Sequence, residues 1–379
     1  MRGWIKSPGW DLVWVLNALW LTPLVLWLAH GHADARTSPV DALYFALTVP
    51  LWAGHRISST WLAYATPGYR PLLRRQWIRF IAAPLAIVVG CFAVVLAPER
   101  LLPMPLGERL VWLALVDYAF VSQHFAAQHF GLLSLYRARA GGASDRVTRR
   151  VDWWFSLVVG GGLVVLADAL AGAIPSQERW LDPVLSHALT RTLHMGGIVL
   201  VSGLTVSMLA VERRSPQRVA YVLGVSGMAL LAFLTRDPFV FVVPWSVQHW
   251  SAAMGVSSLA ASGGSDRRAW GVLLALAVIS VLLLPALEVE AVTDEFVYAD
   301  RIFGAFAWWL RNASFAPALL AFGFATGFVH YLLDRAAFRF SSPEVRRAAR
   351  GLLGDRAGLG VPDVARVLGN GAVARELAR

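Results

Sequence analysis

The sequence contains little charge and almost no cysteine. Asp, Glu, Lys and Arg together make up 15% of its 379 residues, whereas hydrophobic residues make up 57%. A soluble domain carries about a quarter charged residues, so the composition excludes an ordinary soluble enzyme and a disordered chain. Because Cys91 is the single cysteine, the chain cannot form an internal disulfide or a thiolate metal cluster. We expect Cys91 to be a small buried residue.

Several motifs that mark known chemistries are also missing. The sequence has no HExxH zinc motif, none of the HxxHH boxes of membrane desaturases, and no CxxCH haem-attachment site. The run Gly160-Gly161-Gly162 is not followed by Lys-Ser/Thr, so it is not a phosphate-binding loop. Any metal site must therefore combine residues from separate segments, and any haem would be bound non-covalently.

Long apolar runs fill most of the chain. A helix crosses the hydrocarbon core with roughly 20 apolar residues, and by this measure the sequence predicts an all-α, polytopic membrane bundle over residues 1–340. A shorter apolar piece at 302–310 is expected in the membrane interface, and residues 341–379 are expected to form a short basic, helical cytoplasmic tail. About ten transmembrane helices are expected, at 10–28, 40–65, 77–97, 110–136, 153–173, 187–211, 219–235, 238–261, 270–287 and 315–333.

The net charge of +10 comes from arginines that cluster after every second predicted span. Basic residues concentrate in cytoplasmic loops, so this alternation predicts that both termini are cytoplasmic, in a bacterial inner membrane. A cleaved signal peptide ending near Ala33-Asp34-Ala35 is the alternative for the first span, although its apolar run is long for a signal. The arginines in question are Arg70, Arg74, Arg75, Arg79, Arg137, Arg139, Arg146, Arg149, Arg150, Arg213, Arg214, Arg218, Arg267, Arg268, Arg335, Arg339, Arg346 and Arg347.

Histidines are the main ionisable residues inside the predicted spans, where an ionisable group is costly and indicates a functional site. At about 1.5 Å per residue, His124 lies about 20 Å from Arg137 along the helix and His129 about 12 Å. This counting puts His55, His124 and His249 in one layer near the bilayer midplane. His129 and His330 are expected nearer the cytoplasm.

Other polar residues accompany these histidines. Asp117, His124 and Gln128 fall on one helical stripe, and Arg56 follows His55 directly. We expect Asp117 and Gln128 to act as extra ligands or as acceptors that fix histidine tautomers. Arg56 could hold an anionic substrate or pair with Asp117. The sequence also contains a short internal similarity, because Gln123-His124-Phe125 resembles Gln248-His249-Trp250.

These observations favour a membrane-embedded, histidine-ligated metalloenzyme, an oxidoreductase that hydroxylates, desaturates or oxygenates a lipid-soluble substrate. Imidazole suits iron, zinc and copper, and iron is preferred because oxidation of an apolar substrate requires a redox-active metal. The expected partners are the lipid bilayer, a lipid-soluble small molecule and a protein at the cytoplasmic tail, but no nucleic acid. The expected ligands are His55, His124, His129, His249 and His330, and the expected catalytic residues are Asp117, Gln128 and Arg56.

Three alternatives remain open from the sequence. A transporter could use His and Asp as a proton path, with Pro244 as a helix break. A haem- or quinone-binding subunit could use His124 and His249 as axial ligands. A structural membrane subunit would need its histidines only for hydrogen bonds between helices.

Overall fold

The computed structural model describes residues 3–32, 37–140, 145–162, 183–212, 215–235, 238–290, 298–340, 342–349 and 352. Within these ranges the chain is almost entirely helical and contains no β-strand, so the predicted all-α class is confirmed. The chain divides into two compact units. Unit 1 comprises Met1–Tyr44, Ser122–His249 and Gly358–Arg379, and unit 2 comprises Phe45–Val121 and Trp250–Ala357.

Several helices are long and apolar enough to cross a membrane. The described residues include five such spans, or six when the bent pair α1 (Pro8–Trp14) and α2 (Ala18–Ala29) is counted as one. Leu274, Val278 and Leu282 form a stripe of exposed apolar side chains along one of these spans, as expected for a face in contact with lipid. These candidate spans indicate an integral membrane protein. The five spans are Ile78–Leu96, which joins η4 (Ile78–Ala82) to α5 (Ala83–Leu96), α6 (Leu106–Ala140), α10 (Pro216–Leu234), α12 (Asp266–Leu287) and α15 (Ala316–Ala337).

The first predicted span is broken rather than continuous. Helix α1 ends at Trp14, α2 begins at Ala18, and their axes differ by 48°. Side chains donate hydrogen bonds to backbone carbonyl groups at this break: Gln248 Nε2 to the Val15 carbonyl (3.4 Å) and Trp20 Nε1 to the Leu12 carbonyl (3.0 Å). A break inside a membrane is tolerated only where freed carbonyl groups find such donors.

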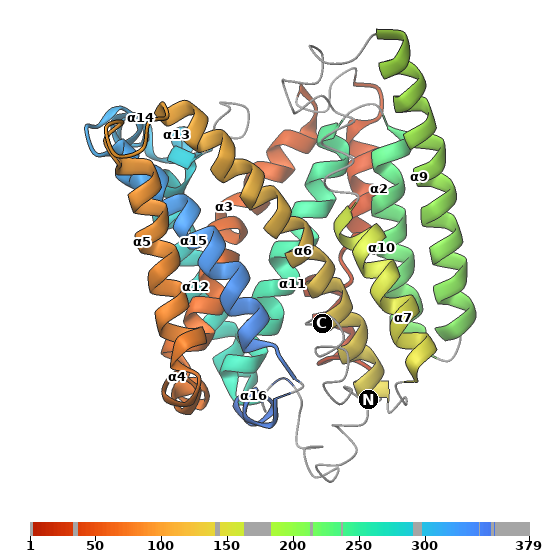
Figure 1. Ribbon diagram of the computed structural model, residues 1–379. Helices are drawn as coiled ribbons and strands as arrows, with labels where there is room; N and C mark the ends of the chain where they lie inside the picture. Colours follow the sequence, from red (N-terminus) through yellow and green to blue (C-terminus); the bar gives the residue numbers. More distant parts are fainter. Residues whose placement is uncertain are drawn as a thin grey trace. The chain divides into compact units, whose positions relative to one another are not determined.

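Unit 1 is built around α10. This helix packs against α2 and against α9 (Pro183–Glu212), and α7 (Arg146–Phe155) packs against α9 as well (Figure 1). Helix α7 continues into η5 (Ser156–Gly162), a π-helical turn. A Cβ atom on Gly161 would lie 2.4 Å from the Ser122 carbonyl oxygen, so only glycine permits this approach of η5 to α6.

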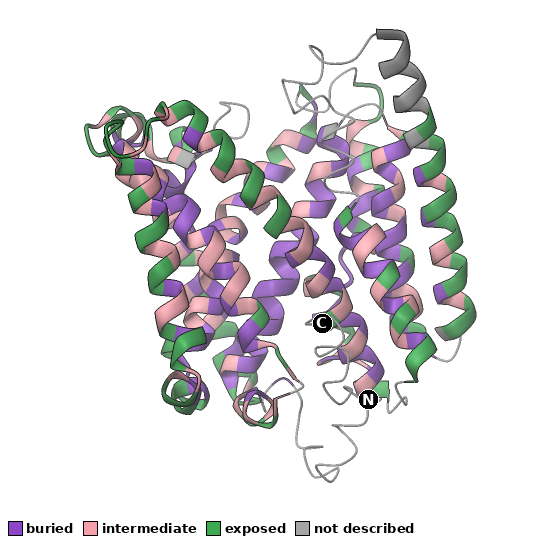
Figure 2. Ribbon diagram, in the orientation of Figure 1, coloured by how far each residue is buried: buried purple, intermediate pink, exposed green. Residues whose placement is uncertain are grey.

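Unit 2 is built around α15, which lies alongside α5 (Figure 1). Cys91 is buried with Phe324 and Ala325 between these helices, and Leu110 and Leu113 of α6 pack against the same cluster. Cys91 is thus the small buried residue that the sequence predicts. Figure 2 shows that α5 exposes much of its surface whereas α11 (Pro238–Ser262) is largely buried.

Three long helices contribute residues to both units. They are α3 (Pro39–Thr60), α6 and α11. Helix α11 begins at Pro238, as predicted, and runs without interruption through Pro244, so the helix break considered for a transporter is not found there. The shorter elements are η2 (Trp61–Ala65), η3 (Pro67–Tyr69), α4 (Arg70–Arg75), η7 (Glu288–Glu290), α13 (Ala299–Phe303), α14 (Ala305–Asn312) and α16 (Pro343–Ala348).

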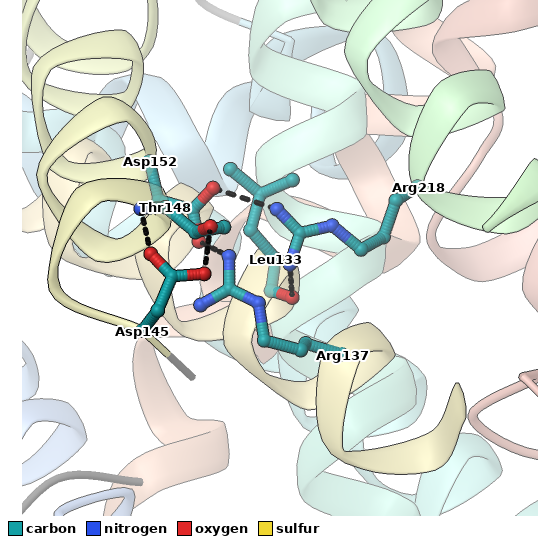
Figure 3. Close-up of polar contacts among 6 residues, drawn as sticks. All are labelled: Leu133, Arg137, Asp145, Thr148, Asp152 and Arg218. Atoms are coloured by element: carbon teal, nitrogen blue, oxygen red, sulfur yellow. Dashed lines mark hydrogen bonds and ion pairs between the residues drawn. The ribbon is translucent and has the colours of Figure 1, made fainter. Parts of the chain in front are cut away.

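A buried ion cluster joins three helices of unit 1 (Figure 3). The Asp152 carboxylate on α7 accepts a charged hydrogen bond from Arg137 on α6 and another from Arg218 on α10, the latter at 2.6 Å. Arg218 also donates to the Leu133 carbonyl at 3.1 Å. All three charged side chains are almost fully buried, so each depends on the others to offset its loss of hydration.

Candidate metal centre

His55 and His330 face each other in the core of unit 2. His55 lies on α3 and His330 on α15, and their ring centroids are 4.9 Å apart at an interplanar angle of 85°. Both side chains are buried. Two imidazoles removed from water need partners for their ring nitrogens, which makes the hydrogen bonds around them informative.

The neighbours of these two rings favour a proton on Nδ1. His55 Nδ1 contacts the Trp52 carbonyl, an acceptor, so Nδ1 carries the proton. His330 Nδ1 lies 3.0 Å from Ser59 Oγ, and the same hydroxyl donates to the His330 carbonyl at 3.5 Å, which leaves Oγ to accept the Nδ1 proton. With Nδ1 protonated, Nε2 is the nitrogen of each ring that could ligate a metal ion. A protonated Nδ1 held by a backbone or hydroxyl oxygen is the arrangement that metal-ligating histidines adopt.

His249 reaches this pair from α11. Its neighbour in sequence, Trp250, stacks on the His55 ring with centroids 5.9 Å apart. Two turns further along α11, the hydroxyls of Ser257 and Ser58 lie 3.4 Å apart. A Cβ on Gly54 would lie 2.7 Å from the Leu276 carbonyl oxygen, so glycine is required where α3 meets α12. Helix α11 is continuous through His249, which holds its backbone in register with these contacts.

The three buried histidines form one group that could hold a metal ion. His55, His249 and His330 each offer one ring nitrogen, and these nitrogens all lie within 4.8 Å of one another. Small side-chain rotations would let one ion with metal–nitrogen distances of about 2.1 Å contact all three. The donor set consists of neutral imidazoles in an apolar core, which suits iron, zinc or copper and not a hard cation such as calcium.

The other two histidines predicted as ligands are described in unit 1. The His124 ring lies 4.9 Å from the His249 ring at 88°, and Phe125 stacks on the His249 ring with centroids 3.9 Å apart. His129 Nδ1 is 2.6 Å from the Tyr221 hydroxyl. Within the described residues, neither His124 nor His129 belongs to the three-histidine group.

The three predicted catalytic residues fall in two places. Gln128 donates its side-chain amide to the His249 carbonyl at 3.1 Å, so it contacts the backbone that carries a predicted ligand. Arg56 and Asp117 lie in unit 2 and approach each other at Gly327 on α15. Arg56 also lies over the Trp52 ring, 4.9 Å from its centroid.

Sequence reasoning missed several side chains that complete the site. Ser59 follows His55 by one helical turn, on the same face of α3, so the spacing of four residues was an available signal. Trp250 and Tyr331 each follow a predicted ligand directly, and nothing in the sequence separates them from other interfacial aromatics. Their roles depend on helix rotation, which only the packed structure gives.

Comparison with known proteins identifies no relative. No protein family, no curated protein and no solved structure matches the chain. The assignment of this chain therefore depends on its own residues. They indicate a helical membrane protein whose buried His55, His249 and His330 could bind a metal ion.

Proposed function

We propose that this protein is a membrane-embedded metalloenzyme that oxidises a lipid-soluble substrate by hydroxylation, desaturation or oxygenation. The observation that carries the proposal is the convergence of three buried imidazoles, with nitrogens within 4.8 Å of one another, in the interior of a membrane protein. Neutral imidazoles that only bridge helices would each face a donor or acceptor of a neighbour. Here they gather around one point, which favours a shared cation.

The protein's residues have separable roles in this proposal. The hydroxyl of Ser59 and the Trp52 carbonyl hold His330 and His55 through Nδ1, so that Nε2 is the nitrogen of each ring that would ligate the metal. Gln128, through the His249 carbonyl, positions the third ligand. The apolar residues around the group exclude water, and a bound redox metal, with iron preferred, supplies the oxidising chemistry.

The proposal includes the remaining predictions from the sequence. His124 is a further ligand, His129 joins the ligand set or holds a second ion, and Asp117 and Arg56 act on the substrate. The chain spans a bacterial inner membrane about ten times with both termini in the cytoplasm, and the basic tail contacts a partner protein or the inner leaflet. Most of the predicted tail, residues 341–379, lies outside the described residues.

Metal analysis of the purified full chain tests the proposal directly. We expect close to one iron per chain and no Soret band in the visible spectrum. The variants His55→Ala, His249→Ala and His330→Ala should each lower bound metal at least about tenfold, since each removes a ligand. His32→Ala is the matched control, because His32 is exposed, and its metal content should equal that of the wild type.

The outcomes separate the competing functions. A Soret band would replace the proposal with a haem protein, and a metal content that the three substitutions leave unchanged would overturn it. Wild-type protein without metal, even after reconstitution with ferrous iron, would also overturn it and would favour transport or a structural role. Loss of metal in His124→Ala would extend the ligand set to His124, as the sequence predicts.

A further inference from the structure

One end of unit 2 carries a dense group of arginines. Figure 1 shows α4 and α16 at this end, and both α4 and α15 pack against η4. The described residues within 66–82 and 334–349 include only two acidic side chains, Asp334 and Glu344, so this surface is strongly positive. Its arginines are Arg70, Arg74, Arg75, Arg79, Arg335, Arg339, Arg346 and Arg347.

Three of these arginines, Arg79, Arg335 and Arg339, form one group. Arg79 lies in η4, Arg335 lies in the last turn of α15, and Arg339 follows the end of that helix. The positive charges of Arg335 and Arg339 are close enough to repel that of Arg79. All three residues are exposed. Arg79 donates to Gln76 Oε1 at 3.3 Å, but a neutral amide does not offset the repulsion, which an anion shared by the group would relieve.

Hydrogen bonds hold the segments that carry the three-arginine group. The Tyr64 hydroxyl donates to the Phe80 carbonyl and so fixes η4 against η2. The Tyr69 hydroxyl donates to the Ala337 carbonyl at 3.0 Å and so ties η3 to the end of α15. The backbone at this end of unit 2 is therefore held in place, which lowers the entropy cost of binding a ligand shared by several side chains.

The three-arginine group lies where a candidate membrane span begins. Arg79 is the second residue of the span Ile78–Leu96. Apolar side chains of the same span face outward, since Ile78 is 63% and Leu85 is 61% exposed. Trp77, directly before the span, is exposed as well, and tryptophan is typical of the depth of lipid headgroups. An anion bound by Arg79 would therefore lie at headgroup depth, above an apolar helix face.

We propose that Arg79, Arg335 and Arg339 bind the phosphate of an anionic phospholipid whose acyl chains lie along the exposed face of Ile78–Leu96. Guanidinium groups donate paired hydrogen bonds to phosphate oxygens, and the negative charge offsets the repulsion within the group. An open surface suffices, because the bilayer surrounds the rest of the lipid. A zwitterionic lipid carries its own cation, and an acidic protein segment would leave the apolar face beside Arg79 uncovered.

The test compares two lipids that have identical acyl chains. Dimyristoyl phosphatidylglycerol is anionic and dimyristoyl phosphatidylcholine is zwitterionic. Each is titrated into the full chain in detergent, and bound lipid is counted by native mass spectrometry. We expect the phosphatidylglycerol to bind at least tenfold more tightly, because each arginine near an anionic headgroup contributes a gain of about fivefold. Equal affinity for the two lipids would overturn the proposal.

Charge-removing variants locate the binding. Arg79→Gln, Arg335→Gln and Arg339→Gln should each weaken phosphatidylglycerol binding about fivefold, and the triple variant should lose the preference for this lipid. Arg100→Gln is the matched control, because Arg100 is exposed beyond the opposite end of Ile78–Leu96 and its substitution removes the same charge. A triple variant with the wild-type preference, or a control as weak as Arg79→Gln, would overturn the proposal.

Two competitors separate a lipid from other anions. Inorganic phosphate and a hexaglutamate peptide are each added to the lipid-bound protein at the concentration of the lipid. We expect neither to displace phosphatidylglycerol, because neither has acyl chains to contact α5. Displacement by phosphate would indicate a site for a free anion, and displacement by the peptide would indicate an acidic protein partner, so either result would overturn the proposal. The three metal-binding histidines are unchanged throughout, so this inference and the proposed function are tested separately.

Discussion

Unit 1 and the core of unit 2 each bury a group of polar side chains, but the two groups differ in kind. In the cluster of Arg137, Asp152 and Arg218, donors face an acceptor of opposite charge, so the group is complementary within itself (Figure 3). In the His55–His330 pair, two rings of the same kind face each other, and their Nδ1 protons are directed to oxygens of neighbouring residues. The ion cluster pairs its own opposite charges, whereas the converging ring nitrogens of the histidines could hold a metal ion.

The substitution with the largest expected effect removes the carboxylate from the ion cluster. It tests whether that cluster stabilises the folded protein. Asp152→Asn leaves two buried guanidiniums without their counter-charge, so it should lower the free energy of unfolding by about 3–5 kcal/mol. Thermal unfolding in detergent measures this loss. Asp145→Asn on the same segment is the control, because Asp145 is exposed and only caps α7 through Thr148, and it should cost at most about 1 kcal/mol. A cost for Asp152→Asn equal to that of the control would show that the cluster contributes nothing to stability.

Glu288 lies between the ion cluster and the histidine group in kind, because its buried carboxyl group is held by hydrogen bonds and not by an opposite charge. It accepts the backbone N–H groups of Tyr298 and Ala299 at 2.9 and 2.6 Å. Burial raises the pKa of Glu288 from 4.5 to about 7. Between these values the folded protein keeps a proton that the unfolded chain has released, so the free energy of unfolding should fall as pH rises from about 4.5 to about 7.

Glu288→Gln should remove this part of the pH dependence, on the order of 1–3 kcal/mol. Thermal unfolding of both proteins across that pH range measures it. Asp145→Asn serves again as a control, because hydrogen bonds from Thr148 lower the pKa of Asp145 below its ordinary 3.8, so it titrates below the range. Parallel pH profiles for the wild type and Glu288→Gln would contradict the assignment.

The substitution with the smallest expected effect is at Ser59. It tests whether the histidine group binds a metal ion with His330 positioned by this hydroxyl. Ser59→Ala removes the oxygen that accepts the His330 Nδ1 proton, so metal affinity should fall about tenfold, or about 1.4 kcal/mol, with little change in unfolding. Competition with a chelator measures the affinity. Ser207→Ala is a suitable control, since that hydroxyl is exposed and bonds only to its own helix at the Gly203 carbonyl. Equal chelator sensitivity in both variants would mean that Ser59 does not position His330.

The helical architecture could be anticipated because it follows from local composition. Apolar runs predicted the positions of α6, α12 and α15 to within a few residues, since a segment of that length and apolarity has few alternatives in a membrane. The break between α1 and α2 could not be anticipated. It depends on the side chain of Gln248, more than 200 residues away, which donates to the Val15 carbonyl.

The candidate site shows the same division. Depth counting placed His55 and His249 in one layer, because rise per residue is a property of the helix alone. It set His330 apart from that layer and favoured His124, yet the structure groups His330 with His55. Depth along an axis does not give the rotation of a helix about that axis, and rotation decides which side chains meet.

By itself, the sequence determined that this chain lies in a membrane as helices and that its costly polar residues are mostly histidines, because hydrophobicity and helix length act locally. Only the tertiary structure decided which three imidazoles converge, which arginines share Asp152, and which polar atoms surround Gly327. These depend on how helices distant in sequence rotate and pack against one another, and close packing admits few such arrangements.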